Sequence, residues 1–251
     1  MRGLAGRKAI VTGGGGAIGQ AISLRLGDEG CHVGIFDIDG DAAADTARLI
    51  VAAGGEANSF TVDVTDYSAT AAAVKDFGNS VGSCEILVNN AGWDQFGEFL
   101  DTTPERWDQV VAVNFMSALN LCHTVLPMMK ERGWGRVINM ASDAGRAGPP
   151  GHSVYSASKG ALIAFGKSLA KELAASGITV NAICPGPNDT PLLIELVPES
   201  SDREALAESN PMGRLGVPED IVGLAAFLAS EESAYITGQA ISVSGGRTTH
   251  G

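Results

Sequence analysis

The segment Lys8–Gly19, KAIVTGGGGAIG, decides the fold of this chain. Its first five residues suit a short, mostly apolar strand, and four consecutive glycines follow at once. Beyond them, apolar residues recur at helical spacing from Ile22 until Gly30 ends the run. A strand that passes through glycines into a helix is typical of a parallel α/β sheet. The segment therefore predicts the first strand, turn and helix of such a sheet.

The small residues of this turn favour the binding of a phosphate group. They let the backbone approach an anion, and the free amides and the dipole at the start of the helix attract it. The spacing G-x-x-x-A-x-G differs from the commoner G-x-G-x-x-G, and glycines also serve plain turns, so the turn alone leaves both interpretations open. The candidate phosphate-binding residues are Gly13, Gly16, Ala17, Ile18 and Gly19.

The rest of the chain alternates strands with helices, without a low-complexity linker or a repeat. Apolar β-type runs predict strands at 32–37, 59–62, 86–88, 136–140, 178–183 and 240–243. Helical patterns predict helices at 41–53, 67–77, 104–132 (bent near Pro127), around 155–159 and at 218–229, with one short helix near 202–208 in an otherwise irregular segment 187–217. This order predicts a single domain over 1–251, an α/β fold whose doubly wound parallel sheet lies between two layers of helices, as in the Rossmann fold.

Composition argues against several classes of function. The net charge is −12, whereas nucleic acids and anionic membranes attract basic surfaces, so we expect neither as a partner. The four cysteines form no C-x-x-C pair and the four histidines form no ligand cluster, so no metal site is expected. We recognise no signal segment and no apolar run of membrane-spanning length. The expectation is a soluble, cytoplasmic protein.

Two acidic residues end strands in the first half of the chain. Asp37 ends the second strand, 18 residues after Gly19, where a carboxylate can bind the adenosine ribose hydroxyls of a dinucleotide. The same carboxylate would repel a 2′-phosphate, so it favours NAD over NADP as the cofactor. Asp63 ends the third strand, next to Val64, and could contact the adenine amino group. For both aspartates the alternative role is the N-cap of the following helix.

Tyr155 and Lys159 stand four residues apart in the sequence YSASK and would share one face of a helix. An ammonium about 4 Å from a phenol lowers the pKa of the phenol by roughly three units at an effective dielectric of about 20. The pair can thereby make a tyrosine exchange protons near neutral pH, although desolvation opposes the shift. Ser142, after the fifth strand, would border the same crevice and could hydrogen-bond a carbonyl, unless it is only a turn residue. Asn114, inside a helix, has either a task at this site or a structural bond to a neighbouring strand.

Several motifs, in order along nearly the whole chain, resemble those of the short-chain dehydrogenase/reductase family. Thr12-Gly13-x-x-x-Ala17-x-Gly19 is similar to its cofactor signature, and Asn89-Asn90-Ala91-Gly92 to its next motif, a turn beside the adenine and ribose. Pro185-Gly186 with Thr190 resembles its loop on the nicotinamide side. The residues that fall on its catalytic tetrad are Asn114, Ser142, Tyr155 and Lys159.

The resemblance implies a hydride-transfer enzyme that uses NAD. Tyr155 would act as general base in alcohol oxidation and as general acid in carbonyl reduction, with its pKa lowered by Lys159. Ser142 would polarise the carbonyl, Lys159 would also bind the nicotinamide ribose, and Asn114 would hold a water that links Lys159 to solvent. His152, near this site, is interpreted as loop or pocket wall. Beyond the glycine turn, Asp37, Asp63 and Val64, the implied cofactor contacts are Asn90, Ala91, Gly92, Tyr155, Lys159, Pro185, Gly186, Asn188 and Thr190.

The sequence does not determine the substrate. Segments such as Asn90–Asp94 and Cys184–Thr190 resemble those of family members that oxidise a cyclic 2-hydroxyacyl-CoA with NAD. We expect residues 187–217 to form a substrate lid, and the pocket wall to include Trp93, Asp143, Pro187, Leu192 and Leu193. The alternatives are a 3-oxoacyl-thioester (acyl-carrier-protein) reductase of fatty-acid type and a non-catalytic nucleotide sensor or scaffold. Because family members are usually tetramers, we expect a homotetramer.

Overall fold

A seven-stranded parallel sheet forms the middle layer of the protein, which we describe over residues 1–249 from a computed structural model. The strands are β1 (Lys8–Thr12), β2 (His32–Asp37), β3 (Glu56–Thr61), β4 (Ile86–Asn89), β5 (Gly135–Met140), β6 (Ile178–Pro185) and β7 (Ala240–Val243). Their spatial order is β3-β2-β1-β4-β5-β6-β7, so the winding reverses between β1 and β4. Doubly wound sheets bind ligands at this reversal, beyond the carboxyl ends of the strands. The predicted fold class is confirmed.

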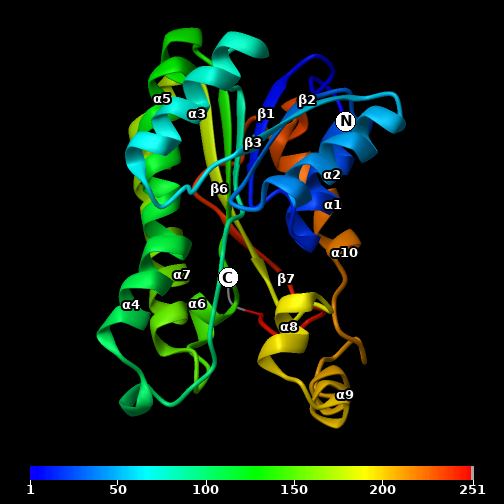
Figure 1. Cartoon of the computed structure of the whole chain (residues 1–251), viewed down its shortest axis with the longest axis vertical. Coiled ribbons are helices and arrows are strands. Elements are labelled where there is room, and N and C mark those ends of the chain that lie inside the picture. The colour runs from blue at the N-terminus through cyan, green and yellow to red at the C-terminus, as the bar shows by residue number, and fades with distance from the viewer. Residues whose placement is uncertain (250–251) are drawn as a thin grey trace.

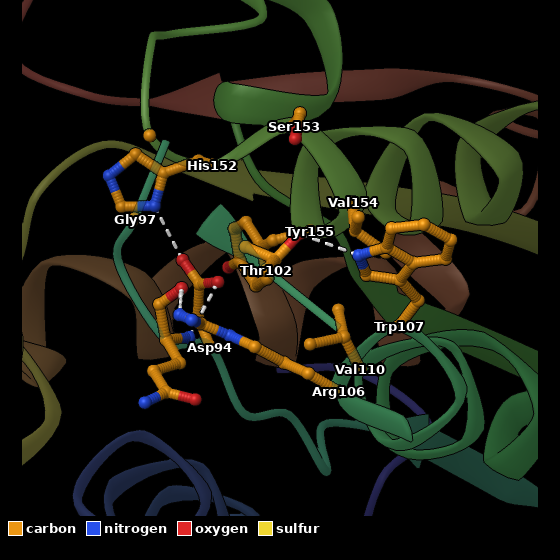
Figure 2. Close-up of a pocket in the computed structure, with 12 residues that line it drawn as sticks. Asp94, Gly97, Thr102, Arg106, Trp107, Val110, His152, Ser153, Val154 and Tyr155 are labelled. Atoms are coloured by element: carbon orange, nitrogen blue, oxygen red, sulfur yellow. Dashed lines mark hydrogen bonds and ion pairs between the residues drawn. The ribbon is translucent and has the colours of Figure 1, made fainter. Parts of the chain in front are cut away.

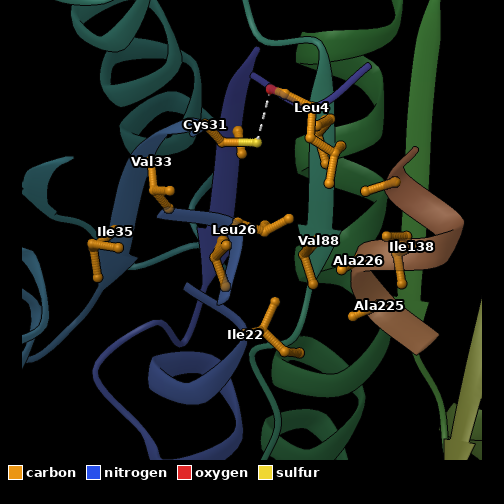
Figure 3. Close-up of a cluster of buried hydrophobic side chains, with 14 of the residues drawn as sticks. Leu4, Ile22, Leu26, Cys31, Val33, Ile35, Val88, Ile138, Ala225 and Ala226 are labelled. Atoms are coloured by element: carbon orange, nitrogen blue, oxygen red, sulfur yellow. Dashed lines mark hydrogen bonds between the residues drawn. The ribbon is translucent and has the colours of Figure 1, made fainter. Parts of the chain in front are cut away.

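Helices cover both faces of the sheet (Figure 1). α1 (Ala17–Asp28), α2 (Gly40–Ala52) and α10 (Pro218–Ala229) lie on one face, and α3 (Tyr67–Ser80), α5 (Ser117–Arg132) and α7 (Ser153–Leu173) lie on the other. Ile22 and Leu26 of α1 and Ala225 of α10 are almost fully buried against the first face (Figure 3). Phe77 of α3 and Leu121 of α5 are completely buried on the other face. The two cores hold the three layers together.

Four smaller helices lie beyond the carboxyl ends of the strands, in the lower half of Figure 1. They are α4 (Pro104–Val111), α6 (Ala144–Ala147), α8 (Pro191–Leu196) and α9 (Ser200–Glu208). The segment 187–217 thus contains one helix more than predicted. The signal for α8 was present, because Pro191 stands at its start and the Thr190 hydroxyl accepts a hydrogen bond from the amide of Leu193.

β3 starts earlier than predicted, at residue 56 rather than 59. Among the described residues it is an edge strand whose one partner is β2, in the register His32↔Glu56 to Asp37↔Thr61. Most of its side chains are exposed, so it lacks the apolar alternation from which strands are recognised. Backbone pairing, and not a buried face, defines its beginning.

The predicted helix over 104–132 is continuous but not uniform. α4 passes into a π-helical turn over Ala112–Met116, and α5 follows from Ser117. Such wide turns are rare and occur often at functional sites. By length and composition the run Pro104–Arg132 could cross a membrane, so the expectation that no run reaches this length was wrong. In this fold, α5 instead buries apolar side chains, Leu121 among them, in the core.

Candidate active site

The glycine turn after β1 leaves no room for most side chains. Gly13 has a positive φ of 59°, and a Cβ on Gly19 would collide with the carbonyl oxygen of Gly13. A Cβ on Gly14 would lie 2.7 Å from the side chain of Ile35. Gly16 is the N-cap of α1 and offers no side-chain cap, so the first amides of α1, from Ala17 on, stay available. The phosphates of a dinucleotide fit such a turn.

Thr12 and Asn90 join this turn to the end of β4. The Thr12 hydroxyl accepts hydrogen bonds from the amides of Asn90 and Ala91, at 2.9 and 3.0 Å. The Asn90 carboxamide donates to the carbonyl oxygens of Thr12 and Gly13, at 3.0 and 3.1 Å. The motif at 89–92 therefore fixes the shape of the glycine turn. The sequence placed Thr12 in the signature but did not reveal this role.

Asp37 lies half-buried at the carboxyl end of β2, beside the glycine turn. Its carboxylate accepts hydrogen bonds from the amides of Gly15 and Asp39, at 2.9 and 3.0 Å. The N-cap of α2 is Asp39, whose carboxylate accepts from the amides of Asp41 and Ala42. The alternative role of Asp37 as the helix cap is therefore taken by another residue.

Asp63 and Val64 follow β3 on the adenine side of the predicted site. Asp63 is exposed, and its carboxylate accepts hydrogen bonds from the amide and hydroxyl of Thr65, at 2.9 and 2.7 Å. The N-cap of α3 is Asp66 rather than Asp63. Val64 is buried, and its carbonyl oxygen accepts a hydrogen bond from the Asn120 carboxamide at 3.1 Å.

Ser142, Tyr155 and Lys159 come together beyond β5. The Ser142 hydroxyl lies close enough to the Tyr155 phenol to lower its pKa, and it accepts a hydrogen bond from the Ala144 amide at 3.1 Å. Tyr155 and Lys159 lie one turn apart on α7, with the Lys159 ammonium 5.6 Å from the centre of the Tyr155 ring. Lys159 is only 3% exposed and donates to the carbonyl oxygen of Met140 at 2.8 Å.

Burial dominates the pKa values of this pair. It raises the pKa of Tyr155 to about 12, against the lowering effect of the bond to Ser142, and the Asp94 carboxylate adds to the rise. Burial also lowers the pKa of Lys159 to about 8. The expectation that Lys159 lowers the pKa of Tyr155 stays a prediction, because burial is the largest cause of the raised pKa in the protein alone. Desolvation of the phenol is a larger effect than the attraction of the nearby ammonium. The phenol therefore keeps its proton at neutral pH.

Asn114 lies in the π-helical turn and is almost fully buried. Its carboxamide donates to the carbonyl oxygens of Trp93 and Val110, at 2.5 and 2.9 Å, and accepts from the Trp93 amide at 3.2 Å. These bonds go to the loop after β4 and to α4, and not to a neighbouring strand as the alternative from the sequence had it. Asn114 is also near Lys159, because a Cβ on Gly92 would lie 3.2 Å from Asn114 Oδ1 and 3.3 Å from Lys159 Nζ.

The loop after β6 is built closely against β7. The Gly186 amide, which follows Pro185, donates to the carbonyl oxygen of Val243 at 3.0 Å, and a Cβ on Gly186 would lie 2.8 Å from the side chain of Ser244. Asn188 is buried and donates from its carboxamide to the carbonyl oxygen of Gly186 at 2.7 Å. Thr190 then caps α8. The predicted nicotinamide-side residues therefore form one ordered loop at the sheet's edge.

The five predicted pocket-wall residues do not share one environment. Trp93, Pro187, Leu192 and Leu193 are half-buried, and the two leucines lie on α8. Asp143 is buried and turned towards β7, where its Oδ1 accepts a hydrogen bond from the Ser242 hydroxyl at 2.6 Å. Its Oδ2 has no hydrogen-bond partner among the described residues. Asp143 therefore has a contact with the sheet that the sequence did not indicate.

A small pocket beside Tyr155 contains residues that were not predicted as site residues (Figure 2). His152, predicted only as loop or pocket wall, lies in it, opposite Asp94. The sequence did not indicate the contact between Asp94 and His152, because it joins segments more than fifty residues apart. The lining residues are Asp94, Gln95, Gly97, Thr102, Arg106, Trp107, Val110, Gly151, His152, Ser153, Val154 and Tyr155.

The cysteines and the possible metal ligands of the described chain lie apart from one another or are buried. Within residues 1–249, no group of three or more His, Cys, Asp or Glu is placed to hold a metal ion; His250 lies outside this range. Burial raises the pKa of Cys31 and of Cys122 to about 12, and that of Cys184 to about 11, so these thiols stay protonated at neutral pH.

Comparison with known proteins agrees with this geometry. A family model described as enoyl-(acyl carrier protein) reductase matches residues 15–248. The chain belongs to the short-chain dehydrogenase/reductase family. It is 38% identical to 2-dehydro-3-deoxy-L-rhamnonate dehydrogenase (NAD(+)) of Sphingomonas sp. SKA58, over 98% of this chain and 96% of that one. It is 39% identical to acetoacetyl-CoA reductase of Shinella zoogloeoides, over 96% and 98% of the two chains.

A solved structure has the same fold along the whole chain. It is described as an NAD(P)-dependent gluconate 5-dehydrogenase from Beutenbergia cavernae with bound NADP, and it superposes with a TM-score of 0.93. The two sequences are 33% identical, and 97% of each chain is covered. The protein is thus an oxidoreductase of the family that acts on CH–OH and keto groups with a nicotinamide cofactor.

Proposed function

We propose that this protein is an NAD-dependent dehydrogenase that transfers hydride between a secondary alcohol or ketone and nicotinamide, with Tyr155 as the general acid and base. The observation that carries the proposal is the convergence of Ser142, Tyr155 and Lys159 beyond β5, on the side of the sheet where Asn114 and the glycine turn also lie. A sensor or scaffold would have no need of such a proton-transferring group in its crevice.

Each polar side chain has a distinct task in this proposal. The phenol of Tyr155 keeps its proton at neutral pH, so it is ready to donate to the oxygen of a ketone. The Ser142 hydroxyl, which lies close to that phenol, holds the same substrate oxygen. A bound nicotinamide would take up or supply the hydride and, when oxidised, would add a positive charge near the phenol. In the oxidative direction, that charge and Lys159 together lower the cost of deprotonating Tyr155.

Asp37 supports NAD rather than NADP as the cofactor. Its carboxylate is held beside the glycine turn by the amides of Gly15 and Asp39, so it cannot easily move away from an incoming 2′-phosphate. The relative from Sphingomonas is named for NAD, whereas the solved structure from Beutenbergia cavernae is described with NADP bound at low occupancy. The decisive measurement is the ratio of kcat/KM with NADH and with NADPH; a large preference for NADPH would reverse this assignment.

For the substrate we propose a hydroxyacyl compound, such as a cyclic 2-hydroxyacyl-CoA or another 3-hydroxyacyl thioester, covered by residues 187–217 as a lid. The relatives named acetoacetyl-CoA reductase support a thioester. A fatty-acid type 3-oxoacyl-(acyl-carrier-protein) reductase is the second candidate, which relatives of that name favour and Asp37 opposes. We also propose that the protein is a cytoplasmic homotetramer. A sedimentation measurement of its mass tests the tetramer.

The test combines a substrate screen with one substitution. Purified protein is given NAD and a panel of cyclic and linear hydroxyacyl compounds, and NADH is followed by its absorbance. Tyr155→Phe should lower kcat by about 10²–10⁴-fold while leaving NADH binding, measured by fluorescence, unchanged. If no compound in the panel changes the absorbance, or if the variant turns over as fast as the parent, the dehydrogenase assignment is wrong.

A further inference from the structure

The short helix α6, which begins two residues after Ser142, is held between α7 and the strand β7. Towards α7 the packing is very close, because a Cβ on Gly145 would lie 2.7 Å from backbone atoms of that helix. Towards β7 the contacts are polar, and they come from the side chains of Asp143 and Arg146. The place of α6 in the fold therefore depends on both neighbours.

Asp143, Ser242 and Arg146 form a chain of hydrogen bonds between α6 and β7. The Ser242 hydroxyl donates to Asp143 Oδ1 at 2.6 Å and accepts from Arg146 Nη1 at 2.8 Å. Arg146 Nη2 donates to the carbonyl oxygen of Ala240 at 2.9 Å. One hydroxyl of β7 thus links a carboxylate to a guanidinium, and both side chains end on the same strand.

This contact is a costly way to join two elements. Asp143 is only 5% exposed, and its Oδ2 has no hydrogen-bond partner among the described residues. Burying a carboxylate with one oxygen unfilled costs more free energy than burying an apolar side chain of the same size. An apolar contact would hold α6 on β7 at lower cost, whereas directed hydrogen bonds fix one relative position. The network therefore indicates a need for position rather than for stability.

The side chain that depends on this position is Ser142. The amide of Ala144, the first residue of α6, donates to the Ser142 hydroxyl at 3.1 Å. The amide of Asp143 donates to the carbonyl oxygen of Pro185, at the end of β6, at 3.0 Å. The hydroxyl is thus held by α6 itself, just beyond the last pairing with β6. A shift of α6 against β7 would move it.

We propose that Asp143 is a positioning residue that holds the catalytic hydroxyl of Ser142 in place. Bonded to Ser242, its carboxylate fixes α6 on β7 and so keeps the Ser142 hydroxyl close to Tyr155. The proposal rests on the dehydrogenase function above, in which Ser142 holds the substrate oxygen. Asp143 acts on the reaction through Ser142 and needs no contact with the substrate.

A double-mutant cycle with Ser142 tests this dependence. The probe is 3-hydroxybutyryl-CoA with NAD, or the hydroxyacyl compound of the panel that the wild type oxidises faster. Asp143→Ala should lower kcat by about 10- to 100-fold, because the hydroxyl is misplaced, while NADH binding stays unchanged. Added to Ser142→Ala, the same substitution should lower kcat by about twofold or less, since the group that it positions is already gone.

The pH profile gives a second readout, which a mere loss of stability would not move. Burial raises the pKa of Tyr155 and the Ser142 hydroxyl lowers it. Asp143→Ala should therefore move the rise of alcohol oxidation to higher pH, in the same direction as Ser142→Ala. The other titratable groups around the phenol are unchanged in this variant; they are Asp94, Lys159 and His152.

Conservative substitutions and a matched control separate position from structure. Asp143→Asn keeps an oxygen that accepts from Ser242 and should recover most of the lost kcat. Ser242→Ala should reproduce the loss of kcat and the shift of the profile, whereas Ser242→Thr keeps the hydroxyl and should not. The control is Thr237→Val, because the Thr237 hydroxyl accepts from the Val180 amide at 3.0 Å, near the other end of β6. It should change neither kcat nor the profile.

The possible failures of the two proposals differ. An unchanged kcat in Asp143→Ala, or the same fold-loss with and without the Ser142 hydroxyl, would refute the positioning role and keep the dehydrogenase function. If Asp143→Ala does not fold, judged by circular dichroism, the cycle is run with Ser242→Ala, and the same results decide. No oxidation of any compound by the wild type would refute both proposals.

Discussion

Replacing the buried Lys159 with methionine should not destabilise the protein at neutral pH, although it should abolish turnover. The ammonium is 3% exposed, and its pKa falls from 10.5 to about 8 on folding. A shift of about 2.5 units, at about 1.36 kcal/mol each, means that folding disfavours the charged form by about 3 kcal/mol. The substitution also removes the hydrogen bond to the Met140 carbonyl oxygen, which destabilises the variant by about 1–3 kcal/mol. Lys159→Met should therefore range from equally stable to about 2 kcal/mol more stable.

The stability difference between Lys159→Met and the wild type should depend on pH. The unfolded chain binds the lysine proton more tightly than the folded protein does. The wild type therefore carries the full free-energy penalty for burying the charged ammonium below about pH 8. It disappears as the pH rises through the folded pKa towards the unfolded value of 10.5. At pH 9.5 only about 1 kcal/mol of the penalty remains. The advantage of Lys159→Met over the wild type should thus shrink by about 2 kcal/mol between pH 7 and pH 9.5.

Urea unfolding followed by circular dichroism at the two pH values measures this change directly. Lys167→Met is the matched control, because Lys167 is exposed on the same helix and its removal should give no such pH-dependent difference. A stability difference between Lys159→Met and wild type that is the same at pH 7 and pH 9.5 would refute the reasoning. It would mean that the ammonium is solvated in the folded protein.

Three further outcomes are expected. Asp37→Ser should lower kcat/KM with NAD by about tenfold or more and raise it with NADP, as initial rates with each cofactor will show; an unchanged ratio would remove Asp37 from cofactor choice. Ser142→Ala removes a hydroxyl that lowers the pKa of Tyr155, so the rise of alcohol oxidation with pH should move to higher pH, and a profile with only its height reduced would contradict this. Gly19→Ala should cost about 1–3 kcal/mol in urea unfolding because its Cβ strikes the turn, whereas Gly78→Ala, which meets nothing within 4 Å, should cost nothing.

Those parts of the fold that repeat a local pattern could be predicted from the sequence. β1, β2 and the glycine turn between β1 and α1 were found because buried parallel strands are apolar throughout and a strand-to-helix turn demands small residues. β3 was misplaced because its position comes from pairing with β2 and not from a buried face. The π-helical turn at 112–116 has no sequence pattern that separates it from an ordinary helix.

The positions of the catalytic side chains could be predicted from the sequence, but their pKa values could not. The spacing of Tyr155 and Lys159 placed both on one helix face, as observed. Their pKa values depend on how completely the surrounding chain excludes water. The spacing of four residues gives no information on that burial. The contact between Asp94 and His152 was invisible for the same reason, since it is made by two loops that only the fold brings together.

The π-helical turn holds one residue more than an ordinary helical turn needs at this place. Because the wide turn absorbs that residue within itself, deleting one residue from 112–116 would let the run close into an ordinary α-helix. α4 would then keep nearly the same orientation, with Arg106 and Trp107 still beside the pocket at Tyr155. The change would fall on Asn114, whose carboxamide holds the Trp93 backbone from within the turn. A deletion here should therefore impair the reaction more than the fold.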